Sequence, residues 1–147
     1  KALMAATPFL PKKPNIKIHE PAFTPTPVPK QVNGLHPLTW RRLYGRYGKI
    51  AEDMIAGADI KDLELITGTH TLWAELPLLA KTEQVRHLSD LLLRRVRIGL
   101  LAQNGGRQFL DRIQDLCENS LPWDQTRWET EKQHYIEHWE SFHSVPV

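Results

Sequence analysis

The uneven distribution of proline is the feature that most constrains the fold of this chain of 147 residues. Eight of its eleven prolines fall within residues 7–37. Proline has no backbone N–H and fixes φ at about −65°, so this stretch is expected to be extended rather than helical. The stretch also carries apolar side chains that a free linker does not require: Phe9, Leu10, Ile16, Ile18 and Phe23. We therefore expect an extended arm that lies along a folded surface.

Charge follows the same division of the chain. Residues 1–34 hold five lysines and one glutamate, for a net charge of +4, whereas residues 35–147 hold 14 basic and 16 acidic side chains, for −2. A nucleic-acid-binding domain needs clustered positive charge to neutralise phosphates. The body of the chain lacks such an excess, which argues against that class. A free-standing helical module that binds nucleic acid through its basic arm remains as an alternative.

The size of the chain fits one domain, and 41% hydrophobic residues can fill a modest core. The single cysteine, Cys117, excludes an internal disulfide framework and fits a reducing compartment. No apolar run approaches the length of a membrane span, and no signal peptide is visible. Because the first residue is Lys1 rather than Met, we expect a fragment or a processed product.

Helical spacing begins at Leu35. The first predicted helix has an apolar face made of Leu38, Leu43, Tyr44 and Tyr47, and Gly48 is placed to end it. A second short helix is predicted at residues 50–56, followed by a loop that contains Gly68. The stretch "LWAELPLLAKTEQ" is compatible with a helix only if Pro77 falls in its first turn.

Residues 83–100 form the central predicted helix, with a restart at Ser89, which is a good N-cap residue. Its apolar side comprises Val85, Leu88, Leu92, Val96 and Gly99. Its polar side comprises Arg86, Asp90, Arg94 and Arg97. Since Asp90 lies four residues from both Arg86 and Arg94, the simplest interpretation is a solvated face with weak ion pairs.

Two further helices complete the predicted fold. Residues 106–118 place Phe109, Leu110, Ile113, Leu116 and Cys117 on one face, which makes Cys117 a core residue rather than a reactive thiol. The last helix begins after the N-cap Asp124, with Trp123 and Trp128 at the hydrophobic-staple positions. Its predicted buried stripe is Trp128, Tyr135, Trp139 and Phe142. The fold class is therefore all-α: a small bundle of about five or six helices preceded by an extended proline-rich arm.

Arg95 projects at the border of the apolar face of the central helix. A half-buried guanidinium needs a carboxylate or carbonyls, and Glu75 and Glu83 are the nearest acidic candidates in sequence. The alternative is a side chain that extends to water. We hypothesise that Arg95, together with Arg94, Asp90 and Glu83, docks this helix onto a neighbouring element or a missing domain.

The "NGG" sequence at the end of the same segment does not match a phosphate-binding loop. A P-loop requires a preceding strand and a terminal Gly-Lys-Ser/Thr, and a dinucleotide fingerprint requires G-x-G-x-x-G. Neither is present. Gly105 and Gly106 are instead expected to form a turn between two helices, because glycine permits positive φ.

The sequence "HYIEH", residues 134–138, matches the H-x-x-E-H signature of inverted zincins. Its spacing places His134 and His138 on one helix face, with Glu137 available as a base. A catalytic zinc requires a third protein ligand, and only nine residues follow His138. A metalloenzyme is therefore the third alternative, and the two histidines are expected at the surface beside Trp139.

The sequence "WRRLYGRY", residues 40–47, interleaves basic and aromatic side chains, as some nucleic-acid-binding segments do. The aromatic residues fall on the apolar face and the arginines largely elsewhere, so core packing plus a solvated basic face is the simpler interpretation. On that face, Arg41, Arg42 and Arg46 are candidates for contact with an acidic partner or an anionic membrane surface.

With these helices in place, a resemblance becomes apparent. "LWAEL", then "EQVRHLSDLLLRRVRIGLL", a Gly-Gly turn, and "LPWDQTRWETEKQHY" occur in the order and spacing of one domain. The chain resembles, from about Leu35 to Tyr135, the C-terminal helical domain of FAD-dependent glycerol-3-phosphate dehydrogenases and the related glycerophosphate oxidases. "KALMAATPFL" looks like the end of a preceding flavin domain. We therefore expect residues 1–34 to end that domain and connect it to a helical C-terminal cap domain at residues 35–147.

The resemblance implies a parent enzyme of the aerobic, bacterial type that oxidises sn-glycerol 3-phosphate to dihydroxyacetone phosphate. In that family FAD takes the hydride, and electrons pass to membrane quinone or to oxygen. The FAD-binding and catalytic motifs lie in the amino-terminal part and do not occur here, so neither catalytic residues nor a cofactor are expected in this chain. The family also implies a missing FAD and substrate domain as partner, peripheral association with the cytoplasmic membrane face, frequent dimers, and no nucleic acid.

Overall fold

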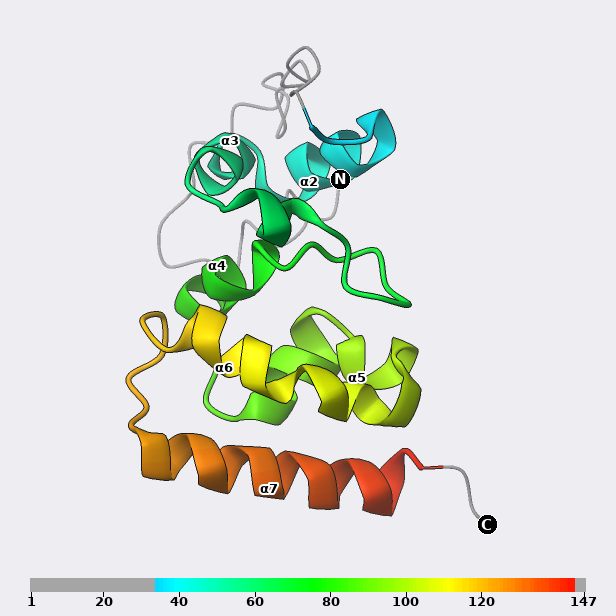
Figure 1. Cartoon of the computed structure of the whole chain (residues 1–147), viewed down its shortest axis with the longest axis vertical. Helices are drawn as coiled ribbons and strands as arrows, with labels where there is room; N and C mark the ends of the chain where they lie inside the picture. The colour runs from blue at the N-terminus through cyan, green and yellow to red at the C-terminus, as the bar shows by residue number, and fades with distance from the viewer. Residues whose placement is uncertain (1–33, 145–147) are drawn as a thin grey trace, which may run out of the picture.

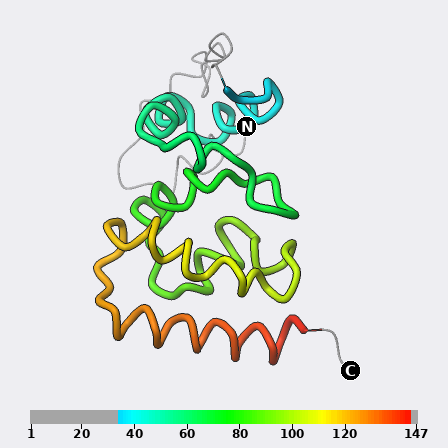
Figure 2. The backbone as a smooth tube through the Cα atoms, in the orientation of Figure 1, coloured from blue at the N-terminus to red at the C-terminus, as the bar shows by residue number. Residues whose placement is uncertain are grey.

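The computed structural model describes residues 34–144, so the proline-rich arm lies outside the described residues. Within that range the fold is all-α, as predicted. Five α-helices have seven residues or more, and strand pairing is limited to one isolated bridge between Leu65 and Leu72. Figures 1 and 2 show α2 and α3 at one end of the molecule and α7 along the other, with α4, α5 and α6 between them.

The first two helices have the boundaries that their sequence signals indicate. Helix α2 (Pro37–Tyr47) has proline at its first position, and Nδ1 of His36 accepts a hydrogen bond from the Leu38 backbone N–H. It ends at Gly48, whose φ of 58° favours glycine. Helix α3 spans Ile50–Ala56, as predicted, and the 3₁₀ turn η2 spans Ile60–Leu63. The prediction was wrong for Leu38, which is 68% exposed.

Helix α4 spans Glu75–Thr82, and its proline lies in the first turn, as the sequence required. Pro77 is the third helical residue and therefore lies in the first turn, where no backbone N–H is needed for the helix ladder. The preceding loop turns at Gly68, with φ of 81°. The bridge between Leu65 and Leu72 closes this loop and aligns its return toward α4.

The prediction of one central helix over residues 83–100 was wrong. Helix α4 stops at Thr82, and Gln84 takes a positive φ of 49°. The chain then forms a π-helical segment, η3 (Asp90–Arg95), close to the predicted restart at Ser89. A second left-handed residue, Arg97, separates it from the short helix α5 (Ile98–Leu101). The breaks let successive pieces bury Leu88, Leu91, Leu92 and Ile98 in one core, so tertiary packing overrides local helix propensity.

The Gly-Gly turn is confirmed, and it needs glycine for two reasons. Within η4 (Gln103–Phe109), Asn104, Gly105 and Gly106 all have positive φ. A Cβ on Gly105 would also lie 2.7 Å from the ring of Trp139, and one on Gly106 would lie 2.7 Å from Cγ2 of Ile98. The helix that follows, α6 (Leu110–Cys117), therefore begins later than the predicted start at Gly106.

Helix α7 (Gln125–Phe142) has the predicted N-terminus. Oδ1 of Asp124 accepts a hydrogen bond from the Arg127 N–H at 2.8 Å, and the rings of Trp123 and Trp128 meet edge to face at 4.7 Å. Two hydrogen bonds attach this helix to the Gly-Gly region: the Tyr135 hydroxyl donates to the Gly105 carbonyl, and Trp139 Nε1 donates to the Gly99 carbonyl. The predicted stripe ends there, because Phe142 is 73% exposed.

Two hydrophobic clusters fill the described part of the chain. The smaller is built mainly from α2 and α3 and comprises Leu35, Trp40, Leu43, Tyr44, Ala51, Ile55 and Leu72. The larger joins α4, η3, α5, α6 and α7, with Trp128, Tyr135, Leu79 and Ile113 among its fully buried members. Tyr47 packs against both clusters and so connects them.

Cys117 is fully buried in the larger cluster, which confirms its predicted core position. Burial raises the pKa of its thiol from 9.0 to about 12. Above about pH 9 the unfolded chain therefore releases this proton while the folded chain keeps it.

Because the unfolded state then binds fewer protons, the Cys117 thiol lowers the free energy of unfolding as pH rises from about 9, by at most about 1.4 kcal/mol per pH unit. Urea unfolding at several alkaline pH values measures this slope. We expect Cys117→Ala to reduce the slope of the free energy of unfolding against pH. The slope that remains should come from the buried tyrosines. An identical slope in the two proteins would contradict the assignment.

Candidate functional site

The most completely buried charged group is Glu75, at the first position of α4, with no exposed surface. Its two carboxylate oxygens accept a bidentate pair of hydrogen bonds from the Arg42 guanidinium, at 2.6 and 2.9 Å. They also accept from the Tyr47 hydroxyl and the Leu72 backbone N–H, both at 2.7 Å. The carboxylate thus joins α2, the loop before α4 and α4 itself.

The electrostatics of this group agree with its geometry. Burial lowers the pKa of Arg42, but the hydrogen bond and the charge of Glu75 outweigh it and raise that pKa overall. The pKa of Tyr47 is raised by burial, and further by the Glu75 charge and hydrogen bond. The guanidinium therefore stays charged and the phenol stays neutral, as structural partners of a carboxylate.

Arg42 does not lie on a freely solvated face as expected, and Arg46, which is exposed, also makes a contact within the chain. Arg42 is bound to Glu75, and Nη2 of Arg46 donates to the backbone carbonyl of Arg95 at 3.0 Å. Of the three arginines predicted for partner contact, Arg41 and Arg46 are exposed and Arg42 is half-buried. The contacts of Arg42 and Arg46 extend from α2 to α4 and to η3.

Arg95 has one of its two predicted acidic partners. Its Nε lies 3.3 Å from a carboxylate oxygen of Glu83, and its Nη2 donates to the Glu83 carbonyl at 3.1 Å. Glu75 is instead occupied by Arg42. Arg46 also approaches the Glu83 carboxylate at 3.9 Å, so a cluster of two arginines and one glutamate joins α2, the end of α4 and the end of η3. The Arg95 and Glu83 side chains are about one third exposed, so solvent screens their attraction.

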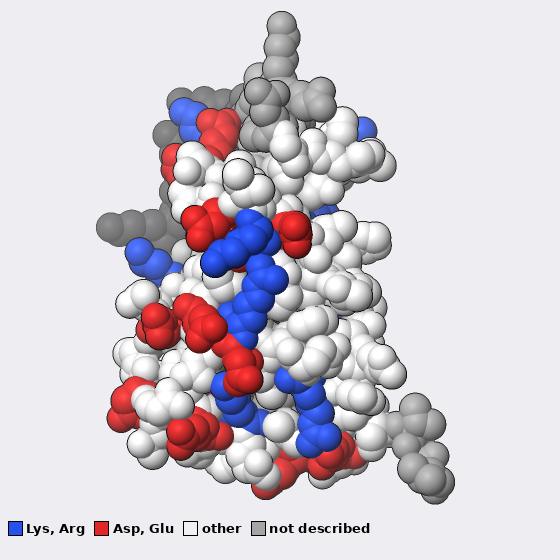
Figure 3. Space-filling model, viewed as in Figure 1, with Lys and Arg blue, Asp and Glu red and all other residues white. Residues whose placement is uncertain are grey.

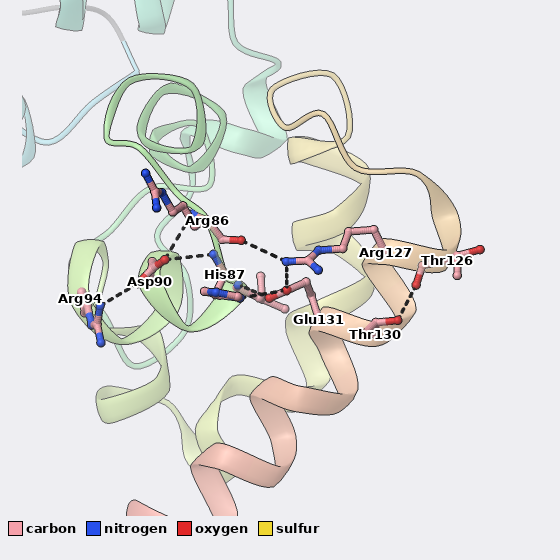
Figure 4. A network of polar contacts seen from close by, with 9 residues as sticks. Arg86, His87, Asp90, Arg94, Thr126, Arg127, Thr130 and Glu131 are labelled. Atoms are coloured by element: carbon pink, nitrogen blue, oxygen red, sulfur yellow. Dashed lines mark hydrogen bonds and ion pairs between the residues drawn. The ribbon is translucent and has the colours of Figure 1, made fainter.

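Asp90 and Arg94 form a surface pair at the start of η3 (Figure 4). Oδ1 of Asp90 accepts from Arg94 at 2.8 Å, and Oδ2 accepts from the backbone N–H groups of Arg86 and His87. Asp90 therefore satisfies donors that precede the helical segment. The Arg94 side chain is 72% exposed, so its guanidinium is accessible for contact with another surface.

A second buried carboxylate, Glu131 on α7, was not identified from the sequence. It is 2% exposed and accepts from the Leu88 backbone N–H at 2.8 Å, while its other oxygen lies 2.5 Å from Arg127 and 3.1 Å from Nδ1 of His87. Figure 4 shows these groups converging between α7 and the segment before η3. The sequence feature that could have identified Glu131 as buried is its position between Trp128 and Tyr135 on the buried stripe of α7.

A third pair joins α6 to η2. Arg112 on α6 donates to the Asp62 carboxylate at 2.9 Å and to the Lys61 carbonyl at 3.0 Å. Its guanidinium also lies 4.1 Å from the centre of the Trp73 ring, within the range of a cation–π contact. This pair too was missed, because its members are 50 residues apart.

The "HYIEH" residues do not assemble a metal centre with the rest of the described chain. His134, Glu137 and His138 are exposed, Glu137 accepts from Gln133, and the His138 ring contacts Phe142. Within residues 34–144 no group of three or more His, Cys, Asp or Glu is placed to hold a metal ion. The third ligand that a zinc mechanism requires is therefore not supplied by this part of the chain.

The aromatic residues of "WRRLYGRY" face inward. Trp40 and Tyr44 are buried in the smaller cluster with their rings 5.4 Å apart, so they do not offer the open faces on which bases stack. Figure 3 shows basic and acidic side chains interleaved on one face of the molecule rather than a field of positive charge. In the described residues, no helix has the length and hydropathy required to cross a membrane.

The buried polar contacts join separate segments of the domain. The buried carboxylates of Glu75 and Glu131 are each bound by an arginine and a backbone N–H of the same chain. The Cys117 thiol is buried and protonated. The described surface offers exposed side chains such as those of Arg41 and Arg94 to another molecule.

We predict that Glu75→Gln lowers the free energy of unfolding by about 3 kcal/mol, because it leaves the Arg42 guanidinium without its counter-charge. Glu83→Gln is the matched control, since that carboxylate is partly exposed, and it should cost less than about 1 kcal/mol. Urea unfolding followed by circular dichroism measures both. Equal losses of free energy of unfolding in the two variants would contradict the larger structural role assigned to the Arg42–Glu75 pair.

We predict that Arg95→Ala destabilises the domain more than Arg94→Ala. Arg95 binds the Glu83 side chain and carbonyl across 12 residues, whereas Arg94 binds a carboxylate one turn away on the same element. Thermal unfolding of the two variants gives the comparison. Small and equal shifts in Tm would remove the tethering role assigned to Arg95.

Comparison with known proteins adds an independent finding. Residues 18–128 match the family model described as the C-terminal domain of alpha-glycerophosphate oxidase. No curated protein and no solved structure matches the chain. The match covers most of the chain, includes part of the proline-rich arm and agrees with the all-α fold. The chain therefore belongs to the family of C-terminal domains of alpha-glycerophosphate oxidase.

Proposed function

We propose that this chain is the C-terminal cap domain of a FAD-dependent enzyme that oxidises sn-glycerol 3-phosphate to dihydroxyacetone phosphate. We further propose quinone as the electron acceptor, with oxygen as the alternative. The observation that carries the proposal is the family match over residues 18–128. The coarser statement, a C-terminal domain of a flavoenzyme of the oxidase or dehydrogenase kind, follows from the family itself.

The described residues do not fit FAD themselves. A dinucleotide is usually held by a glycine-rich turn between a strand and a helix. Here no such strand is present within residues 34–144, and the Gly-Gly turn is filled by Trp139 and Ile98. In this proposal the cofactor and the reacting groups belong to a separate FAD and substrate domain of the parent enzyme.

The role that we assign to this domain is structural and interactive. Its buried charges stabilise its own fold, which leaves the surface for docking. The candidates for contact with the FAD domain are Arg94, Arg95, Asp90 and Glu83, of which Arg94 is the most exposed. Arg41 and Arg46 are the exposed candidates for contact with a further partner. In this proposal the parent lies at the cytoplasmic face of the membrane as a peripheral protein and forms a homodimer.

An antibody raised against this chain of 17.0 kDa tests the proposal on extracts of the source cells. We expect a much larger band in the membrane fraction. The captured protein should contain flavin and should reduce a soluble quinone analogue when sn-glycerol 3-phosphate is added. Hydrogen peroxide formed in place of reduced quinone identifies oxygen as the acceptor.

Two results would contradict the proposal. A single band at the size of the chain itself would mean that the chain works without a flavin domain. A larger flavoprotein that is inactive with sn-glycerol 3-phosphate, but active with another substrate, would retain the cap-domain role and reject the reaction.

A further inference from the structure

An open groove of about 530 Å³ lies between α3, η2, α4 and α6. Figure 1 shows α3, α4 and α6 following one another along the same side of the molecule. The floor is apolar and comprises Ile50, Met54, Ala58, Pro77, Leu78 and Leu116. Ile50 is 51% exposed, so the described residues leave part of this apolar surface in contact with water.

The charged residues that line the groove within the described part of the chain have one sign of charge. They are Asp53, Asp59 and Asp62, and none of the described lining residues is a lysine or an arginine. Asp62 is already bound by Arg112. Asp59 lies 3.7 Å from Lys61 with both side chains exposed, and the Asp53 side chain is exposed on α3. The rim therefore presents at least one carboxylate, Asp53, to whatever covers the apolar floor.

We propose that this groove is occupied by the chain's own arm, through residues 16–23, "IKIHEPAF". This segment combines the two properties that the groove demands. Ile16 and Ile18 supply apolar side chains for the floor, and Lys17 supplies a positive charge for the rim. In an extended chain, successive side chains alternate in direction, so Ile16 and Ile18 share one side while Lys17 lies on the other.

The composition of the whole arm supports this occupant. Residues 1–34 carry a net charge of +4, which is complementary to the acidic rim. The prolines of the arm restrict its conformations in the unbound state. Docking of an extended, proline-rich segment consequently costs less conformational entropy than docking of a flexible one.

The arm is also long enough to reach the groove. Gly34, the first described residue, lies eleven positions after Phe23, and an extended chain rises about 3.1 Å per position, so this stretch spans up to about 34 Å. A domain of this size has a radius of gyration of about 13 Å. Helix α3, which lines one side of the groove, follows α2 directly in the chain and contacts it.

The family match provides a separate reason to assign the arm to this domain. It begins at residue 18, before the first described helix, so the domain family includes most of the segment that we place in the groove. An arm that only connected two domains would not need the apolar side chains at positions 16, 18 and 23.

Disulfide trapping in the full 147-residue chain tests the proposal. Lys17→Cys is combined with Asp53→Cys on the groove rim, or with Glu52→Cys as a matched control. Glu52 is exposed on the same helix and gives nearly the same loop length, but it does not line the groove. The native Cys117 is fully buried and should not react. Diamide serves as the oxidant, and the products are identified by non-reducing electrophoresis and peptide mass.

We expect the Lys17–Asp53 cysteine pair to form an intrachain disulfide about tenfold faster than the control pair, because docking raises the effective concentration of the two thiols. Equal rates for the two pairs would overturn the proposal, since they would reflect random collisions of the arm. A disulfide between two chains as the main product would also overturn it and would identify a second copy as the occupant.

Two further variants separate docking from damage to the fold. Ile18→Ser lies in the arm and leaves the described helices unchanged, and it should reduce the rate of the Lys17–Asp53 pair to that of the control. Leu78→Arg adds a positive charge at the groove and should have the same effect, with helix content checked by circular dichroism. An unchanged trapping rate in Ile18→Ser would overturn the proposed contact.

Discussion

A carboxylate with no exposed surface, at the first position of α4, is the interaction on which the arrangement of this domain depends. Glu75 binds a guanidinium and a hydroxyl from α2 and a backbone N–H from the loop before α4. An isolated buried carboxylate is strongly unfavourable, so it is tolerated only where partners satisfy it. Because those partners come from separate segments, the charge can be satisfied in only one arrangement of α2 against α4.

Glu131, at the other end of the fold, is also a buried carboxylate whose partners come from more than one segment. Glu75 and Glu131 each accept from one arginine and from one backbone N–H outside a regular helix, that of Leu72 or that of Leu88. The helices here are short and separated by residues of positive φ. Loops between such helices leave buried backbone donors that need acceptors, and the carboxylates supply them. The buried charges thus compensate for the interruptions that let the core pack closely.

Local signals in the sequence predicted local features well. Glycine at the end of α2, Pro77 in the first turn of α4 and the Asp124 cap of α7 all act within a few residues. The break at Gln84 and the left-handed Arg97 were not predictable in this way, because they depend on how residues 88–98 pack into a common core. The exposed positions of Leu38 and Phe142 have the same origin, since helical spacing alone does not show where a neighbouring element ends.

The buried charges were the harder part of the site. Arg95 was correctly expected to need a carboxylate, and Glu83 supplies it, but Arg42 appeared to be one of three solvated arginines. The pairing of Arg42 with Glu75 spans 33 residues, and no local pattern encodes it. The sequence feature that could have identified Glu75 as buried is that it is the single acidic residue inside the apolar run "LWAELPLLA". An acid in such a run indicates a buried partner, whose identity only the fold supplies.

Native-state hydrogen exchange tests the central claim most directly, namely that buried carboxylates join the α2–α3 end of the domain to the main core. If Glu75 couples the two clusters, the most protected amides of α2 and those of α6 should exchange through the same global opening, with one free energy and one dependence on denaturant. If the amides of α2 and α3 exchange through a separate opening of several kcal/mol lower free energy, the two ends unfold independently and the account is wrong.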